Sequence, residues 1–128
     1  MKKILMIIFA FPLLAKANSI CDNISVSQQV YACSKTSLEK SDADLNNEYK
    51  KLLSKVSAKY NSHEELRNEY INKIKLSQRA WVNFRDKNCE VFSYQIEVGT
   101  PAYETSMNSC KDKMTQERTK NLVSIQNQ

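Results

Sequence analysis

The sequence contains almost no residue that would interrupt a helix. Its 128 residues include a single glycine, Gly99, and two prolines, Pro12 and Pro101. Glycine and proline are the least favourable residues in a helix interior, and good helix formers fill the long segments on either side of residues 99–101. No segment alternates apolar and polar residues as a half-buried strand does. The chain is therefore predicted to be all-α, with a turn at Gly99 and Pro101.

The first 17 residues have the pattern of a secretory signal peptide. Two lysines precede the apolar stretch 4–14, and the Ala-Lys-Ala that follows has the small-x-small form of a cleavage site. The stretch is shorter than the roughly 20 residues that span a bilayer. We therefore expect a signal peptide, residues 1–17, and one helical domain, residues 18–128, that is exported to the periplasm or secreted without stable membrane insertion.

Removal of the signal peptide lowers the net charge. The whole chain has a formal charge of +5 at pH 7, but three lysines lie in residues 1–17, so 16 basic residues remain against 14 acidic ones, a charge of about +2. Such a small excess gives little long-range attraction to polyanions. Nucleic acid is therefore excluded as a partner, and the same charge offers no long-range steering toward a strongly basic protein.

All four cysteines follow the predicted cleavage site, at Cys21, Cys33, Cys89 and Cys110. An even number of cysteines in a small exported domain indicates two disulfides formed in an oxidising compartment. The sequence has no Cys-x-x-Cys pair, and its one histidine, His63, is far from the cysteines along the chain. Neither a metal site nor another cofactor is therefore expected.

Two long helices are predicted before the glycine. The segments 25–28 and 62–65 have the form of a capping box, with Ser25 and Ser62 in the cap position, and mark helix starts. The first helix is expected to run to about residue 58 and the second to about residue 96. Residues at three- and four-residue spacing should face the core. On the first helix these are Leu38, Leu45, Tyr49, Leu52 and Val56, and on the second they are Leu66, Tyr70, Ile74, Ser77, Trp81, Phe84 and Val91.

A third helix is predicted after Gly99. Glycine can end the preceding helix in the left-handed conformation, Thr100 can cap the next helix, and Pro101 suits its first position. The residues of this helix that should face the core are Met107, Cys110, Met114, Arg118, Leu122 and Ile125. Short turns make neighbouring helices antiparallel, so the expected fold is a three-helix antiparallel bundle stapled by two disulfides.

The same turns allow the facing residues to be estimated. A first turn centred between residues 61 and 62 places Asp42 opposite Trp81 and Asp44 opposite Arg79. A second turn centred on residue 99 places the third cysteine opposite the fourth. Four cysteines allow three pairings, and this register favours Cys89 with Cys110 and Cys21 with Cys33. A bridge from Cys33 to Cys89 would instead join the first two helices.

The carboxylates Asp42 and Asp44 lie close enough along the chain for either to act as a general acid or base. Arginine neighbours keep carboxylates ionised, which disfavours proton transfer. We interpret the pair as part of a polar clasp around Trp81, completed by Arg85 and Asn46. The chain also lacks a second histidine for a His-Glu-x-x-His site and a Gly-x-Ser-x-Gly elbow. No catalytic residues are assigned, and the protein is not expected to be an enzyme.

An ordered set of motif residues spans nearly the whole domain. It comprises Cys21, Cys33, Asp42, Leu45, Asn46, Tyr49, Gln78, Arg79, Ala80, Trp81, Phe84, Arg85, Asp86, Cys89, Cys110, Thr115, Arg118 and Leu122. With this set the chain resembles the LprI-type lysozyme inhibitor family of small exported bacterial proteins. That family commonly has a Gly-Gly-Ser-like turn where this chain has Val-Gly-Thr at 98–100. The resemblance implies a helical periplasmic or secreted domain and, from the founding type, inhibition of lysozyme.

The sequence is thus interpreted as that of a non-enzymatic binding protein whose partner is a protein, with a lysozyme or related muramidase as the first candidate. The segment from Tyr94 to Tyr103 around Gly99 is the candidate contact for the target, because tyrosine offers a large area and a polar tip. The alternative is a structural or stress-related envelope factor with no lysozyme target. A hydrolase that uses Asp42 and Asp44 is the least favoured hypothesis.

Overall fold

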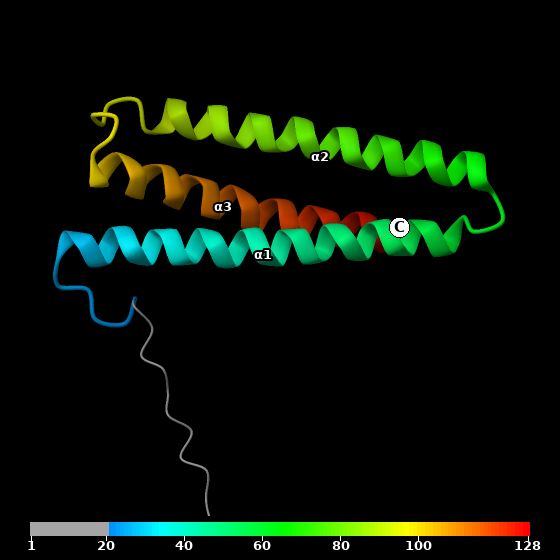
Figure 1. The fold of residues 1–128 in the computed structure, drawn as a ribbon, viewed down its shortest axis with the longest axis horizontal. Helices are drawn as coiled ribbons and strands as arrows, with labels where there is room; N and C mark the ends of the chain where they lie inside the picture. Colours follow the sequence, from blue (N-terminus) through cyan, green and yellow to red (C-terminus); the bar gives the residue numbers. More distant parts are fainter. Residues whose placement is uncertain (1–20) are drawn as a thin grey trace, which may run out of the picture.

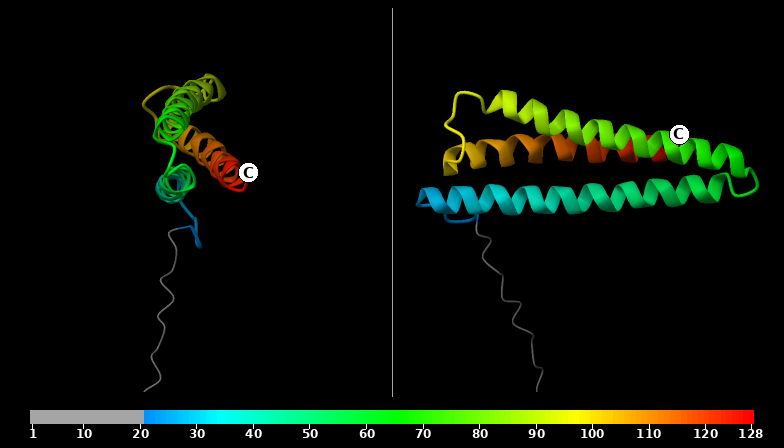
Figure 2. Two further views of the ribbon diagram at one scale, coloured as in Figure 1. Left: turned by 90° about the vertical axis from the view of Figure 1, so that its right-hand side faces the viewer. Right: turned by 45° about the horizontal axis from the view of Figure 1, so that its top comes forward.

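A computed structural model describes residues 21–128 as three helices, α1 (Ser27–Lys59), α2 (Glu64–Phe92) and α3 (Pro101–Gln126). The helices lie along one long axis, with α2 antiparallel to α1 and α3 (Figure 1). Viewed from the end, they form the corners of a triangle (Figure 2, left). The predicted all-α three-helix bundle is confirmed. The predicted signal peptide, residues 1–17, lies outside the described residues.

The start of α1 differs from the predicted one by one residue. Val26, not Ser25, is the cap residue. The Oε1 atom of Gln29 accepts hydrogen bonds from the backbone N–H groups of Ser25 at 2.6 Å and Val26 at 3.2 Å. A glutamine reaches back to the free N–H groups as a capping box requires, but it is Gln29 rather than the predicted Gln28. The helix therefore begins later along the chain.

The bounds of α2 also differ from the predicted ones. His63 takes the cap position expected for Ser62 and makes no side-chain cap bond, while its backbone N–H donates to the carbonyl of Tyr60 at 3.0 Å. The helix ends at Phe92 rather than near residue 96. Ser93 follows it, is fully buried, and lies 2.8 Å from the hydroxyl oxygen of Ser106 on α3. This buried bond draws the chain toward α3 before the glycine is reached.

The predicted start of α3 is confirmed. Gly99 adopts a left-handed conformation with φ of 84°. The Oγ1 atom of Thr100 accepts a hydrogen bond from the backbone N–H of Tyr103 at 3.2 Å, and Pro101 is the first helical residue. Each residue thus has the backbone role that its chemistry favours.

The apolar core lies toward the end of the bundle that carries the α1–α2 turn. Its buried members are Leu45, Leu52, Val56, Ile74 and Leu122. Tyr49, Tyr70 and Trp81 pack against this cluster and are partly buried. Burial of an aliphatic side chain of this size stabilises the folded state by about 1.5–3 kcal/mol. The predicted inward residues of α1 and the C-terminal part of α3 are therefore largely confirmed.

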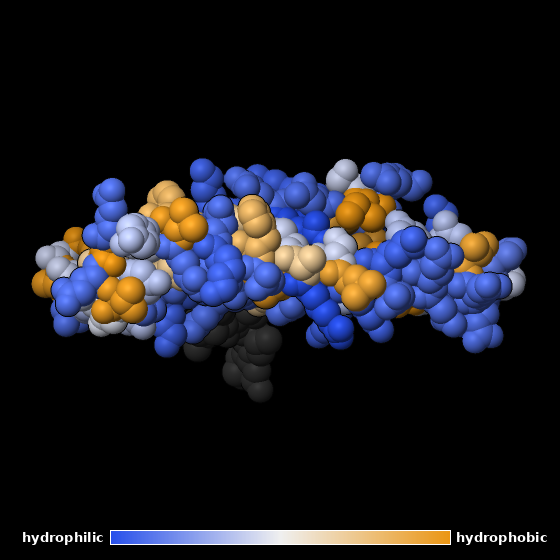
Figure 3. Space-filling view, turned by 90° about the horizontal axis from the view of Figure 1, so that it is seen from above, coloured by the Kyte–Doolittle hydropathy of each residue, from blue (hydrophilic) through white to orange (hydrophobic). Residues whose placement is uncertain are grey.

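The predicted inward stripe of α2 is partly wrong. Leu66, Phe84 and Val91 are exposed by 52%, 58% and 76%, and apolar patches are visible on the α2 side of the molecule (Figure 3). The inward positions that follow Ile74 along the helix instead include the polar residues Gln78 and Arg85. Both are accommodated because they bond to polar partners on other helices. A prediction from apolar spacing alone therefore assigned part of the exposed face of α2 to the core.

Polar side chains line the interface between α1 and α3. The hydroxyl of Ser41, which is buried, donates to a carboxylate oxygen of Asp112, and the amide of Asn108 donates to the hydroxyl of Ser34 at 3.3 Å. α1 packs much more extensively on α3 than on α2. The first and third helices therefore form the closest pair, and α2 is attached through fewer contacts.

Candidate functional site

Two regions were candidates for function, the cluster around Trp81 and the loop between α2 and α3. Trp81 lies between two guanidinium groups. The Cζ atom of Arg85 is 5.3 Å from the ring centroid and that of Arg118 is 5.8 Å from it. Contacts of this type are worth about 0.5–2 kcal/mol, with the larger values where water is excluded. The tryptophan ring therefore contacts the guanidinium group of Arg85 from its own helix and that of Arg118 from α3.

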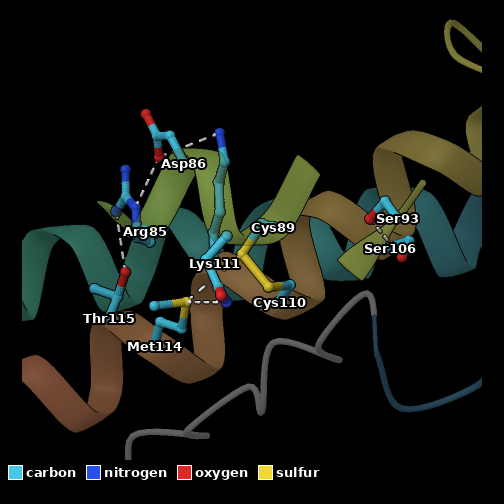
Figure 4. Close-up of a disulfide and its surroundings, with 10 residues drawn as sticks. Arg85, Asp86, Cys89, Ser93, Ser106, Cys110, Lys111, Met114 and Thr115 are labelled. Atoms are coloured by element: carbon cyan, nitrogen blue, oxygen red, sulfur yellow. Dashed lines mark hydrogen bonds and ion pairs between the residues drawn. A yellow bond between two sulfur atoms is a disulfide. The ribbon is translucent and has the colours of Figure 1, made fainter. Parts of the chain in front are cut away.

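Arg85 connects all three helices. Its side chain is 11% exposed, and its Nη1 atom lies 2.8 Å from Oδ1 of Asp42 on α1. The same nitrogen donates to the hydroxyl of the fully buried Thr115 on α3 at 3.0 Å. Its Nε atom donates to Asp86 at 3.0 Å, and Lys111 lies 3.5 Å from the same carboxylate oxygen (Figure 4). Every charge in this group has a partner of opposite sign.

Arg118 fixes the other side of the tryptophan. Its Nε atom donates to Oε1 of Gln78 at 3.0 Å, and its Nη2 atom donates to the hydroxyl of Ser77 at 3.1 Å. Partial burial lowers the pKa of Arg118 below its ordinary value. A group with so high an ordinary pKa stays charged at neutral pH. Arg118 therefore serves as a permanent donor between α2 and α3.

The contacts between the first two helices differ from the estimated ones by about one helical turn. Asp42 contacts Arg85 rather than lying opposite Trp81. Asp44 does not pair with Arg79 but with Lys40 on its own helix at 2.6 Å, and its carboxylate raises the pKa of that lysine. α1 ends at residue 59 and α2 begins at residue 64, so the turn is centred where the estimate placed it. The difference lies in the side chains, because Arg85 reaches Asp42 from one turn beyond Trp81 along α2, while Asp44 pairs within α1.

Asn46 is not part of the clasp, contrary to the prediction. Its side chain and that of Arg79 are exposed along a groove of about 460 Å³ between α1 and α2, which Tyr49 and Gln78 also line. The clasp consists instead of Trp81 with the residues that the two arginines bond. Thr115, which the sequence interpretation treated only as a motif residue, supplies the contact to α3. A buried hydroxyl on a helix gives no signal in an apolar pattern.

The cluster offers no free group for chemistry. Within residues 21–128, every buried side-chain nitrogen and oxygen has a hydrogen-bond partner, and no group of three metal-ligating side chains is close enough to hold an ion. The partners of the two arginines are other side chains of the same domain. This geometry is that of a clasp between helices.

The loop between α2 and α3 is braced at its base. Cys89, which is fully buried, is joined to Cys110 with Cα atoms 5.7 Å apart, as the register favoured. The bond between the hydroxyls of Ser93 and Ser106 lies one turn closer to the loop (Figure 4). The other disulfide, Cys21 to Cys33, ties the segment before α1 to that helix. Both disulfides lie toward the same end of the bundle.

Large apolar side chains project from this braced loop. Phe92, Tyr94 and Val98 are exposed by 71%, 85% and 75%. Tyr103, which the sequence interpretation placed in the same contact segment, is partly buried. Phe92 and Val98 were missed as surface residues because apolar residues near a helix end are ordinarily assigned to the core. The exposed surface is thus larger than the predicted pair of tyrosines.

A family model described as "Lysozyme inhibitor LprI" matches residues 21–122. The match begins at the first cysteine and includes all three helices up to Leu122 in the core. It therefore contains both the clasp and the braced loop. In the part of the chain that the structure describes, no helix is long and apolar enough to cross a membrane.

Two further comparisons found proteins similar to this chain. The Escherichia coli (strain K12) protein YecT, described as uncharacterized, is 39% identical over 62 residues, which cover 46% of this chain and 38% of that relative. The chain thus matches well under half the length of the curated relative. The crystal structure of a DUF1311 family protein from Pseudomonas putida KT2440 has a TM-score of 0.72 and 24% identity, and the match covers 83% of this chain and 99% of that one. The two proteins share the three-helix fold.

Proposed function

Because this chain belongs to the LprI lysozyme inhibitor family, we propose that it is an exported, non-enzymatic binding protein that inhibits a lysozyme-type muramidase. Its two disulfides are typical of proteins from oxidising compartments, which agrees with the periplasm or the cell exterior. The family is one of inhibitors by name rather than of enzymes. The partner is accordingly a protein.

The observation that carries the proposal is the braced apolar loop. Tyr94 is the most exposed of the large apolar residues in the described chain, at 85%. The loop that bears it is fixed by the disulfide of Cys89 on one side and by the capped start of α3 at Thr100 on the other. A rigid loop loses little conformational entropy on binding, and aromatic side chains commonly supply most of the binding energy of an interface. We propose this loop as the inhibitory contact, inserted into the glycan cleft of the target.

The clasp is not proposed as an inhibitory surface. Arg85 and Arg118 are partly buried and bonded to residues of other helices. A target that recruited either guanidinium group would first have to break these bonds, and leaving their partners unsatisfied is costly. The motif residues that identify the family therefore support the frame that holds the loop.

The proposal is tested by titrating the oxidised mature protein against lysozymes of several types while cell-wall lysis is followed. The Tyr94→Ala/Tyr103→Ala variant should need at least about tenfold more protein for half-inhibition, since a central aromatic contact is worth about 2 kcal/mol or more. Phe84→Ala is the matched control, because Phe84 is exposed on the outer face of α2. Circular dichroism should remain helical for both.

Three results would contradict the proposal. Equal inhibition by the double tyrosine variant and the wild type would remove the loop from the contact. Failure of the wild type to inhibit any lysozyme type would favour the alternative, a structural or stress-related envelope factor. A lower inhibition by Phe84→Ala than by the tyrosine variant would move the contact to the outer face of α2.

A further inference from the structure

The charges of this protein are segregated along its long axis. We define the disulfide end as residues 21–34 and 88–110, which contain both disulfides, the first turns of α1 and α3, and the loop between α2 and α3. These segments lie together at one end of the bundle (Figure 1). They contain four acidic residues and no lysine, arginine or histidine. The acidic residues are Asp22, Glu90, Glu97 and Glu104.

The rest of the domain has the opposite charge. All 16 basic residues that remain after residue 17 lie outside the disulfide end, together with 10 of the 14 acidic ones. The disulfide end thus carries a formal charge of −4 and the remainder +6, and of the four carboxylates Glu90 is paired with Lys87, directly before this segment, at 2.9 Å. The small net charge of the mature chain conceals this difference. The charge that a partner meets depends on which end it approaches.

Exposed apolar side chains are also concentrated at the disulfide end. Seven of the twelve large apolar residues that are exposed in the described chain lie there. They are Ile24, Val26, Val30, Val91, Phe92, Tyr94 and Val98. Next to them is a groove of about 370 Å³ between α1 and α3, lined by residues that include Val30, Pro101 and Ala102. An apolar surface with a polar rim is typical of a protein interface.

We propose that the disulfide end docks onto a basic protein surface, one that presents lysine and arginine side chains around an apolar patch. The proposal rests on the proposed function, in that the basic protein is the inhibited muramidase. Glu97 and Glu104 are exposed and form no ion pair with another side chain of residues 21–128, so both carboxylates are available to a partner. Complementary charge raises the association rate and excludes acidic partners.

The proposal extends the contact beyond the loop. The segment before α1, which carries Ile24 and Val26, is tied to that helix by the disulfide of Cys33. Ser27 and Val30 of α1 line the groove at the start of α3, and Glu104 lies on the first turn of α3. The two disulfides thus hold two separate chain segments in one surface. A second copy of the chain is disfavoured as a symmetric partner, because two acidic ends would repel each other.

The test compares two charge-reversal variants that change the net charge equally. Glu97→Lys/Glu104→Lys alters the disulfide end, and Glu39→Lys/Glu117→Lys alters exposed carboxylates elsewhere on α1 and α3. The probes are a strongly basic lysozyme and the same lysozyme with its lysines succinylated, which replaces their ammonium groups by carboxylates. Affinity is measured by calorimetry at about 50 mM and about 300 mM salt, with inhibition of lysis measured in parallel.

We expect the first variant to bind the basic lysozyme at least about tenfold more weakly than the wild type at the lower salt concentration, and the second within about twofold. The wild type should bind succinylated lysozyme more weakly than the unmodified form. Equal losses for the two variants would overturn the inference. So would concentration-dependent self-association of the wild type that Glu97→Lys/Glu104→Lys abolishes, because the end would then contact the basic part of another copy.

The two proposals fail separately in this experiment. Inhibition that is insensitive to both charge reversals overturns the inference about the disulfide end and leaves the inhibitor function intact. Binding that depends on Glu97 and Glu104 but does not inhibit lysis overturns the inhibitor function and supports the docking surface. A wild type that does not bind the basic lysozyme at either salt concentration contradicts both.

Discussion

The Nη1 atom of Arg85 on α2 lies 2.8 Å from Oδ1 of Asp42 on α1, between the two helices that pack together least extensively. The same nitrogen also donates to Thr115 on α3. A single guanidinium group thus joins three helices whose apolar contacts are unevenly distributed. Asp42, Arg85 and Thr115, which belong to the motif set on which the resemblance rests, meet at this junction, while the exposed apolar loop is separate from it.

Replacing Arg85 by alanine should destabilise the domain because Asp42 and Thr115 would both lose a partner. We expect a loss of about 2–3 kcal/mol in the free energy of unfolding, below the value for a fully buried ion pair because Asp42 is 42% exposed. Urea unfolding of the oxidised protein measures it. Lys40→Ala removes an exposed pair within α1 and should destabilise the domain much less than Arg85→Ala does. Similar losses for the two variants would show that Arg85 is not a clasp.

The two disulfides should contribute unequally to stability. Replacing both Cys89 and Cys110 by alanine should lower the free energy of unfolding by about 3 kcal/mol, because this disulfide closes a loop of 21 residues in the unfolded chain. Loss of the bridge between Cys21 and Cys33 should cost less, because residues 21–26 add no buried side chain to the core and can detach locally. Denaturant unfolding of both variants tests this, and an equal or reversed order would contradict it.

Gly99 should be sensitive to substitution although space surrounds it. A Cβ atom at this position would meet no atom within 4 Å, but φ is +84°. Gly99→Ala should therefore lower the free energy of unfolding by about 1 kcal/mol through backbone strain alone. Gly99→Asn should cost less, since asparagine tolerates the left-handed region better. Thermal unfolding of both variants gives the comparison, and a neutral alanine would show that the turn can relax.

Acid should weaken the contact of Glu48 with its neighbours. The Lys51 ammonium at 2.7 Å and the Gln126 amide at 3.1 Å lower the pKa of this carboxyl from 4.5. A carboxyl whose folded pKa lies below its unfolded pKa contributes stability at pH values above the unfolded pKa, and this contribution is lost as the pH falls through the folded pKa. The melting temperature of Glu48→Gln should therefore fall less than that of the wild type between neutral pH and about pH 3.

The control for this acid effect is Glu39→Gln, at an exposed glutamate of the same helix. It should retain the pH dependence of the wild type. The melting temperatures of the three proteins are compared at each pH. An identical pH dependence for Glu48→Gln and the wild type would mean that the contacts of Glu48 do not persist in solution.

The sequence predicted the helical fold well because its strongest signals are local. The turn at Gly99 and Thr100, and the disulfide partner of Cys89, follow from backbone preference and from counting residues on either side of one turn. The inward residues of α1 follow from apolar spacing, since Leu45 and Leu52 are buried. These features need no knowledge of distant contacts.

The site was harder to predict because it depends on tertiary partners. Gln78 and Arg85 face inward only because acceptors on other helices satisfy them, so apolar spacing selected Phe84 instead. The facing residues of the first two helices were misjudged because counting from a turn ignores the reach of a side chain, and Arg85 contacts Asp42 from one turn beyond Trp81. The charge segregation was visible in the sequence as a run without basic residues from 88 to 110. Its meaning depended on knowing that the start of α1 lies at the same end (Figure 1).

The central claim is that the clasp around Trp81 holds the three helices together and that the disulfide end binds the target. The most direct measurement is lysozyme inhibition by Tyr94→Ala and Asp42→Asn, made side by side at a temperature where both are folded. We predict that Tyr94→Ala loses inhibition at an unchanged melting temperature, and that Asp42→Asn melts earlier but inhibits as the wild type does. Normal inhibition by Tyr94→Ala together with lost inhibition by a folded Asp42→Asn would contradict the account.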